Sequence, residues 1–403
     1  MQFSPDNVEC LCPAEPACDV MPSLRAFRPF SDEICLFLHA LSQTLMADKE
    51  AKAFPDVITF GFFCRKGNIE RLKEAYREQS SYRLGRGVTF HIAPANVPVN
   101  FAYSLVCGLL AGNACIVRAP SRPFPQTGII CRAIQQVLER EEFRPLRDYI
   151  AIVRYGRDND LTAYFSGLCD VRIIWGGDDT IQEIRKTPIP ARAFDLTFAD
   201  RYSICVIQAA AYLVQPDPGK TAQDFYNDTY LYDQNACSSP RLLVWIGSGE
   251  AIHRAKQKFW AAVHEVVQAR YTLAPILAVD KLTALCRCAM ELPGAQAASM
   301  PDHLIDRIRI EKLSPDLDQY RCAGGSFLEY DDQNLDALAS ITTRKFQTMS
   351  YIGFQPEDLR EWVLSNGLSG IDRIVPVGRT ADFGPIWDGY DLISCLSRVC
   401  DAA

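Results

Sequence analysis

Short apolar segments alternate with helix-forming segments between residues 88 and 186, and this alternation constrains the fold more than any other feature. Four apolar segments predict strands, at residues 88–93, 114–118, 149–153 and 171–175. Segments with helical periodicity follow them, at residues 100–110, 127–139, 159–168 and 179–186. Strands and helices that alternate at this spacing form βαβ units around a mostly parallel sheet. The sequence therefore predicts an α/β fold with a Rossmann-type domain.

A second α/β region is predicted after the first. Its strand-like segments lie at residues 203–207, 241–246, 307–311, 326–330 and 348–353, with helical segments between them. The predicted organisation is a cofactor-binding domain at residues 1–208, with a helical lead-in at 1–85, a catalytic domain at 209–370 and a C-terminal segment at 371–403. That last segment is expected to begin as a strand, to end as a helix, and to return to the first domain or to an oligomer interface.

Composition argues against several classes of protein. The formal net charge of −7 disfavours nucleic acid as the main partner, because neutralising phosphates requires a surplus of Lys and Arg. No apolar run approaches the roughly 18 residues of a membrane-spanning helix, and residues 1–20 lack a signal-peptide pattern. The 16 cysteines then predict a reducing, cytoplasmic environment. Their spacing supports no zinc site, so no metal is predicted.

Cys237 is the candidate nucleophile. It lies in the segment Asp-Gln-Asn-Ala-Cys-Ser-Ser-Pro, residues 233–240, between a predicted helix at 221–232 and the strand at 241–246. A thiol at such a junction can reach a cleft, where nearby dipoles or charges stabilise its thiolate. The alternative is a buried structural cysteine, since free cysteines are among the most buried residues.

Further candidates follow the strands of the first domain, because ligands of parallel sheets bind beyond the carboxyl ends of the strands. Pro94 and Pro98 stiffen the first of these turns around Asn96. The Asn96 amide can stabilise an oxyanion, or it can simply cap the next helix.

Two more turns hold candidate cofactor-binding residues. The turn after the second strand contains Arg118, Ala119, Pro120, Ser121 and Arg122. A guanidinium there suits ribose or phosphate recognition, and solvated surface arginines are the alternative. After the fourth strand, Gly176 and Gly177 allow close approach of a phosphate to a helix N-terminus. Asp178 and Asp179 equally predict a simple helix cap there.

The order of these motifs resembles the aldehyde dehydrogenase superfamily. The shared motifs are Pro94-x-Asn96, then Ala111-Gly112-Asn113 with its strand, then the glycine pair and then the cysteine segment. The cysteine segment at 233–240 and the run Trp-Asp-Gly-Tyr-Asp-Leu at 387–392 are similar, more narrowly, to acyl-CoA reductases. These are the reductase components of bacterial bioluminescence fatty acid reductase complexes. The resemblance covers about residues 85–400.

The resemblance implies roles for individual residues. Cys237 takes the place of the nucleophile, Asn96 that of the oxyanion donor, and Arg118 that of a cofactor-binding lysine. Ser121 stands where many NAD-specific members carry a glutamate, which with Arg122 favours NADPH. The glutamate that activates water in the superfamily should fall near residues 198–201, where Asp200 is the one carboxylate. Transfer of the acyl group to water is therefore expected to be inefficient.

The expected function is NADPH-dependent reduction of an acyl thioester to an aldehyde through an acyl-Cys237 intermediate. The acyl donor is expected to be acyl-CoA or an acyl carrier protein, and the resemblance adds acyl-transferase and acyl-protein synthetase subunits as partners. Two alternatives stay open: an aldehyde dehydrogenase that uses Asp200 as its base, and a non-catalytic scaffold that carries an acyl group. A homo-oligomer is expected, as for most enzymes of this size.

Overall fold

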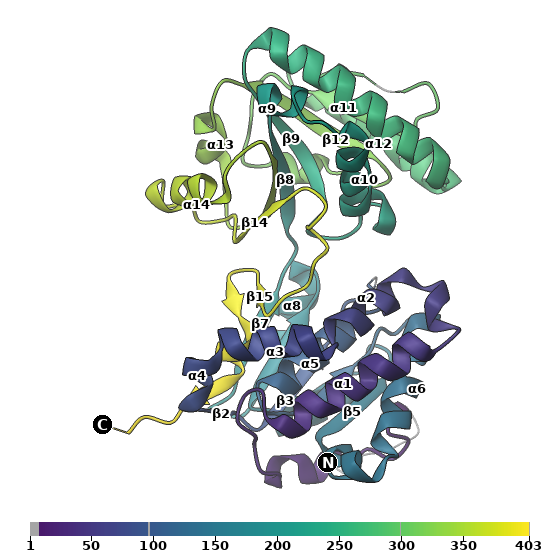
Figure 1. Ribbon diagram of the computed structural model, residues 1–403, viewed down its shortest axis with the longest axis vertical. Coiled ribbons are helices and arrows are strands. Elements are labelled where there is room, and N and C mark those ends of the chain that lie inside the picture. The colour runs from purple at the N-terminus through teal and green to yellow at the C-terminus, as the bar shows by residue number, and fades with distance from the viewer. Residues whose placement is uncertain (1–7, 96, 299, 403) are drawn as a thin grey trace. The chain divides into compact units, whose positions relative to one another are not determined.

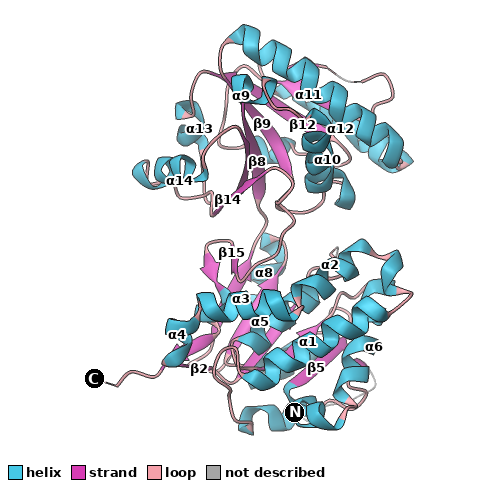
Figure 2. Cartoon of the chain, viewed as in Figure 1, coloured by secondary structure: helices cyan, strands magenta, loops and turns pink. Residues whose placement is uncertain are grey.

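The computed structural model describes residues 8–95, 97–298 and 300–402 (Figure 1). The chain divides into two compact units. Unit 1 comprises Met1–Ala199 and Pro385–Ala403, and unit 2 comprises Asp200–Gly384. Both units contain helices packed on a sheet (Figure 2). The assignment of a cofactor-binding and a catalytic role to separate domains stays a prediction.

Unit 1 is built on a six-stranded sheet with the order β1-β5-β4-β3-β6-β7. Its strands are β1 Glu9–Cys12, β3 Val88–Ile92, β4 Ala114–Arg118, β5 Ile150–Arg154, β6 Val171–Trp175 and β7 Phe194–Phe198. All neighbours pair in parallel except β1 with β5. From β3 the chain proceeds to β4 and β5 on one side, and then to β6 and β7 on the other. The strand order therefore reverses between β3 and β6, which is where parallel α/β sheets bind their ligands.

The helices of unit 1 cover this sheet. They are α1 Asp32–Ala47, α2 Pro55–Phe63, α3 Lys66–Ala75, α4 Arg77–Ser81, α5 Asn100–Leu110, α6 Pro125–Leu138, α7 Asn159–Leu168 and α8 Asp178–Arg185. All five residues of β3 are buried, as expected of a parallel strand that is covered on both faces. The predicted strands and helices of this region are confirmed. Strands β1 and β7 were not predicted.

The C-terminal segment belongs to unit 1. It comprises β15 Ile386–Trp387, β16 Tyr390–Asp391, α15 Leu392–Cys395 and β17 Ser397–Val399. Strand β17 pairs antiparallel with β2 Arg83–Gly85 (Figure 1). The prediction that this segment ends as a helix was wrong, because residues 397–399 form a strand that pairs with β2. The Asn113 amide adds to this contact by donating to the carbonyl of Leu396, at 2.9 Å.

Unit 2 contains a seven-stranded sheet with the order β10-β11-β12-β9-β8-β13-β14. Its strands are β8 Tyr202–Gln208, β9 Pro240–Ile246, β10 Gln296–Ala297, β11 Asp306–Arg309, β12 Ser326–Asp332, β13 Phe346–Ile352 and β14 Arg373–Pro376. Its helices are α9 Ala209–Leu213, α10 Pro218–Thr229, α11 Gly249–Arg270, α12 Pro275–Glu291, α13 Asp336–Ile341 and α14 Pro356–Ser365. All strand pairs are parallel except β10 with β11.

Each face of the unit 2 sheet carries its own apolar core. One core gathers the aromatic residues Phe225, Trp245, Phe259, Trp260 and Phe327. The other contains Tyr202, Met349 and several leucines and isoleucines. Strands β8, β9 and β13 contribute buried side chains to both cores, and this burial stabilises the centre of the sheet. None of the described helices combines the length and the apolar character that crossing a bilayer requires.

We predict that Gly112→Ala strongly destabilises unit 1. Gly112 has a φ of +93°, and a Cβ there would overlap the carbonyl oxygen of Phe27. The substitution forces the loop that contains Asn113 away from β2, at an expected cost of at least about 2 kcal/mol. Urea denaturation measures the change, with Gly167→Ala in α7 as the control. A Cβ at Gly167 meets nothing within 4 Å, so the control is expected to be neutral or stabilising by up to about 1 kcal/mol. Equal effects of both substitutions would contradict the prediction.

Candidate functional site

The loop that carries Cys237 joins α10 to β9. Helix α10 ends at Thr229, a 3-10 turn covers Tyr230–Tyr232, and β9 begins at Pro240. Asp233 and Gln234 adopt left-handed backbone conformations, with φ of +50° and +59°. Such conformations are uncommon outside glycine and reverse the chain sharply here. The predicted position of Cys237 at a helix-to-strand junction is confirmed.

The side chain of Gln234 fixes this loop to the sheet. It is completely buried, and its amide nitrogen donates to the carbonyl oxygens of Pro240 and Ser326, each at 3.0 Å. Its amide oxygen accepts from the backbone nitrogens of Gly325 and Ser326, at 3.0 and 3.1 Å. Because every donor and acceptor of the amide is used, the loop is tied to the first residues of both β9 and β12.

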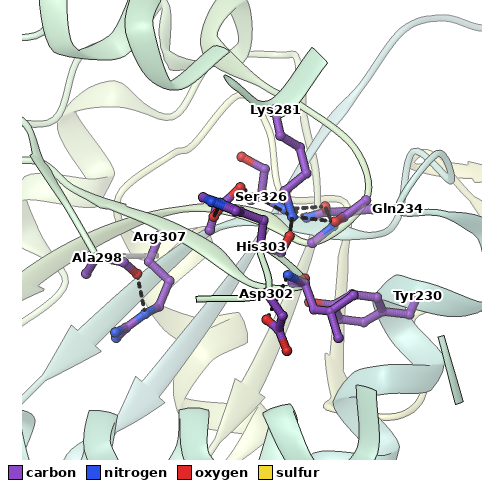
Figure 3. A network of polar contacts seen from close by, with 12 residues as sticks. Tyr230, Gln234, Lys281, Ala298, Asp302, His303, Arg307 and Ser326 are labelled. Atoms are coloured by element: carbon purple, nitrogen blue, oxygen red, sulfur yellow. Dashed lines mark hydrogen bonds and ion pairs between the residues drawn. The ribbon is translucent and has the colours of Figure 1, made fainter. Parts of the chain in front are cut away.

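A buried lysine also supports this loop, through the backbone of a neighbouring segment (Figure 3). Lys281 of α12 donates to the carbonyl oxygens of His303 and Gly324, at 2.6 and 2.8 Å, and pairs with Asp306 at 3.4 Å. The backbone nitrogen of Gly324 in turn donates to the carbonyl oxygen of Asp233, at 3.0 Å. Burial lowers the pKa of Lys281, while the Asp306 carboxylate opposes that shift. This polar network therefore holds the start of the Cys237 loop.

Cys237 is exposed, and its sulfur has an amide donor beside it. The side-chain nitrogen of Gln347, on β13, donates to Sγ of Cys237 at 3.4 Å. The hydroxyl of Ser203 donates to the carbonyl oxygen of Cys237 at 2.7 Å and accepts from the backbone nitrogen of Thr348 at 3.2 Å. One hydroxyl thus joins the Cys237 loop to the strand that carries Gln347. Gln347 was not predicted as a site residue.

Arg373, at the start of β14, brings positive charge to this region. Its guanidinium donates to the carbonyl oxygens of Thr380 and Asp382, at 2.6 and 2.5 Å. Burial lowers the pKa of Arg373, while negative charge at Asp382, then at Asp228 and then at Cys237 acts in the opposite direction. The guanidinium is therefore held by backbone oxygens and lies within electrostatic range of the thiol.

Asp228 of α10 holds the segment that binds Arg373. Its carboxylate accepts from the backbone nitrogens of Gly378 and Thr380, at 2.7 and 3.0 Å. Burial raises the pKa of Asp228 to about 6, although these two N–H groups favour the ionised form. No sequence pattern singles out this carboxylate, because its partners lie about 150 residues away.

The predicted cofactor-binding residues lie in unit 1, at the carboxyl edge of its parallel strands. Pro94 follows β3, the turn 119–122 follows Arg118 of β4, and Gly176 and Gly177 follow β6. Asn96 lies outside the described residues. The sheet topology thus brings these three turns to one edge, next to the reversal of strand order. The role of each residue stays a prediction.

Arg118 and Arg122 differ in how they are held. The Arg118 guanidinium donates to the carbonyl oxygen of Gly156 at 2.7 Å and lies over the ring of Tyr155, 4.5 Å from its centroid. Arg122 is exposed and lies 5.5 Å from the centroid of Phe124. Arg118 is therefore fixed by the loop after β5, whereas Arg122 projects into solvent at the end of the sheet.

Asp200, the candidate base of the hydrolytic alternative, is bound to an arginine. Both of its carboxylate oxygens accept from the guanidinium of Arg321, one of them at 2.8 Å. This hydrogen bonding is the main cause that raises the pKa of Arg321. Both oxygens of the Asp200 carboxylate are therefore occupied by a bidentate ion pair with Arg321.

The architecture defines the class of protein. Aldehyde dehydrogenase 21 from Physcomitrella patens aligns with a TM-score of 0.63 over 95% of this chain and 87% of its own, at 12% identity. A NAD-dependent benzaldehyde dehydrogenase from Corynebacterium glutamicum aligns with a TM-score of 0.63 over 99% of this chain and 95% of its own, also at 12% identity. The chain therefore has the predicted α/β fold of the aldehyde dehydrogenase superfamily.

The chain belongs to the acyl-CoA reductase (LuxC) family, whose model matches residues 67–283, more than half of its length. The long-chain acyl-protein thioester reductase of Aliivibrio fischeri is 25% identical over 229 residues, or 56% of this chain. That of Vibrio harveyi is 28% identical over 300 residues, or 73% of this chain. The matches span 44% and 59% of the length of these two relatives.

We predict that Gln234→Leu destabilises unit 2 and loosens the Cys237 loop. The substitution leaves two backbone N–H groups and two carbonyl groups without their buried partner, at a cost of at least about 3 kcal/mol. Urea denaturation and hydrogen exchange of residues 233–240 measure the effect. Gln223→Leu on α10 is the control, because that amide bonds to Asn227 on its own helix. If Gln234→Leu lowers the free energy of unfolding no more than Gln223→Leu does, the prediction is contradicted.

We also predict that Asp228 makes the stability of the protein depend on pH. The pKa of Asp228 is about 6 in the folded protein, against 3.8 for an unperturbed carboxyl. Between these values only the folded state holds the proton, so the free energy of unfolding falls as the pH rises. The contribution changes by roughly 2 kcal/mol between pH 4 and pH 7. Asp228→Asn should lack it, and denaturation curves of both proteins over this range test this. If the free energies of unfolding of the two proteins differ by the same amount at every pH in this range, the prediction is refuted.

Proposed function

We propose that this chain reduces an acyl thioester to an aldehyde, with Cys237 as the nucleophile and NADPH as the electron donor. The carrying observation is the exposed Cys237 thiol, with a buried amide donor 3.4 Å from its sulfur and a guanidinium in electrostatic range. Both groups favour the thiolate, which is the reactive form of cysteine. Membership of the acyl-CoA reductase (LuxC) family supports the choice of substrate class.

The proposed reaction has two stages. The Cys237 thiolate attacks the thioester carbonyl, the thiolate of the donor departs, and the acyl group stays on Sγ as a new thioester. The Asn96 amide and the Cys237 backbone N–H stabilise the oxyanion that forms during the attack. A bound reduced nicotinamide supplies the hydride for the second stage. Hydride addition to the acyl carbonyl leaves a thiohemiacetal oxyanion, whose collapse breaks the C–S bond, releases the aldehyde and restores the thiolate.

The parallel sheet of unit 1 is the proposed cofactor site. The turns with Pro94, with Ala119 and Pro120, and with Gly176 and Gly177 lie at the edge where such sheets bind nucleotides. Gly177 is exposed, and a Cβ there would meet nothing within 4 Å, so a phosphate can approach the α8 backbone closely. Arg122 is exposed, and together with Ser121 it favours a 2′-phosphate and hence NADPH.

The ion pair of Asp200 favours reduction over hydrolysis. In the hydrolytic alternative this carboxylate must take a proton from water, but Arg321 holds both of its oxygens. We infer that the acyl-enzyme is not passed efficiently to water. The scaffold alternative also uses the exposed Cys237 thiol to carry an acyl group, and it differs from the proposed function in lacking the reduction by a bound cofactor.

The substrate and partners are proposed from the relatives. Their names point to a long-chain acyl group on a protein, so acyl carrier protein or another acyl-protein is a donor beside acyl-CoA. Acyl-transferase and acyl-protein synthetase subunits are the proposed partners, and a cytoplasmic homo-oligomer is the proposed form. The described residues contain no group of three or more His, Cys, Asp or Glu side chains arranged to hold a metal ion.

We predict that the protein becomes acylated at Cys237 and that NADPH removes the acyl group. The protein is mixed with acyl-CoAs of increasing chain length, and intact-protein mass spectrometry is performed before and after NADPH is added. The expected result is an acyl adduct on Cys237 that disappears with release of the corresponding aldehyde.

Two variants provide the comparison for this experiment. Cys237→Ala should abolish the adduct, whereas Cys286→Ala should not, because Cys286 is an exposed cysteine on α12 outside the proposed site. An adduct that NADPH leaves unchanged would instead favour the scaffold function. Release of the free acid in place of aldehyde would favour the hydrolytic alternative.

A further inference from the structure

We propose that Gln347 is a catalytic residue that stabilises negative charge on the sulfur of Cys237. The inference rests on the proposed role of Cys237 as nucleophile and adds a second residue to that site. It starts from one contact, the hydrogen bond from Nε2 of Gln347 to Sγ of Cys237, at 3.4 Å. Because the contact is to the reacting atom itself, Gln347 acts on the chemistry directly.

The Gln347 side chain is buried and its amide is oriented. The residue is 1% exposed, and its Oε1 accepts from the hydroxyl of Thr348 at 3.3 Å. With the oxygen engaged by a donor, Nε2 faces the sulfur. A thiolate can only accept hydrogen bonds, so this is the orientation that the ionised form requires. A neutral amide also adds no charge that burial would penalise.

The backbone fixes the distance between the two side chains. The Ser203 hydroxyl donates to the carbonyl oxygen of Cys237 and accepts from the backbone nitrogen of Thr348, the residue after Gln347. Ser203 lies on β8, the strand between β9 and β13. The Cys237 loop and the Gln347 strand are therefore joined through one central strand of the sheet, and the donor is preorganised toward the sulfur.

Sulfur is negatively charged at two points of the proposed reaction. The first is the free thiolate before it attacks the thioester. The second is the collapse of the thiohemiacetal oxyanion that hydride addition leaves, when the C=O bond of the aldehyde forms, the C–S bond breaks and its electron pair passes to sulfur. In the acyl-enzyme between these points the sulfur is uncharged. A donor aimed at sulfur therefore stabilises both the attacking form and the departing form of Cys237.

Arg373 acts on the same thiolate in a different way. Its guanidinium donates to the carbonyl oxygens of residues 379, 380 and 382, and its interaction with Cys237 is electrostatic. Arg373 thus interacts with the thiol through its charge, and Gln347 is the direct donor. Removing the amide is expected to raise the pKa of the thiol by about one to two units while the Arg373 contribution remains.

The test is the pH dependence of Cys237 alkylation by iodoacetamide, followed by peptide mass spectrometry. It needs neither cofactor nor thioester. Gln347→Leu removes the donor, and Gln347→Glu replaces it with a carboxylate of the same shape that repels the thiolate. Both variants should shift the alkylation profile to higher pH, by about one to two units for Leu and by more for Glu. At pH 6 to 7 the rate should fall about 10-fold to 100-fold, and at high pH it should approach the wild-type rate.

A merely structural role for Gln347 predicts a different result. It would change the reactivity of Cys237 at every pH by the same factor, or leave it unchanged, and either result in a folded variant overturns the proposal. Gln223→Leu, on α10, is the control and should keep the wild-type profile. If Gln347→Leu does not fold, the alkylation profile of the isosteric Gln347→Glu variant tests the proposal instead.

Acylation by acyl-CoA separates this inference from the proposed function. If the profile shifts as expected but Cys237 takes no acyl group from any thioester, the proposed function is wrong and the donor role stands. If Cys237 is acylated but the alkylation profiles of both variants match wild type, the proposed function stands and the role of Gln347 is refuted.

Discussion

The four hydrogen bonds of the Gln234 amide are the interaction on which the placement of Cys237 depends. They tie a loop with two strained backbone conformations to the first residues of β9 and β12. A buried amide that loses any one of these partners leaves polar groups unsatisfied, so the loop has one favourable arrangement. The completely buried Gln234 therefore anchors the loop in which the exposed Cys237 thiol lies.

An amide and a guanidinium lie near the Cys237 thiol. Cys237 has an amide donor in Gln347 and a cation in Arg373, and the cation is held by backbone oxygens. Asp228 acts one step further away, through the backbone of the segment that binds Arg373. Such a site stabilises a thiolate through preorganised dipoles, which suits a nucleophile that must be regenerated in its ionised form.

Local sequence patterns were sufficient for most of the fold. The apolar run of β3 and the helical periodicity of α5 could be read directly, and so could the junction around Cys237. Strand β17 could not, because Ser397–Val399 becomes a strand only by pairing with residues more than 300 positions earlier. Gln347 was missed for a similar reason. It lies one residue before the predicted strand at 348–353, and only the pairing of β13 with β8 brings it to the sulfur.

The pairing of β17 with β2 also has a consequence for how the chain is made. Unit 2 is inserted into unit 1, whose last strand is encoded by residues 397–399. During translation, unit 2 leaves the ribosome complete while β2 and the Asn113 amide still lack their C-terminal partners. Domains tend to fold as they emerge, so the inserted unit can become native first. Residues 397–399 must then be made before unit 1 can form its separate two-stranded sheet of β17 and β2, so unit 1 is the later of the two units to gain all its strand pairs.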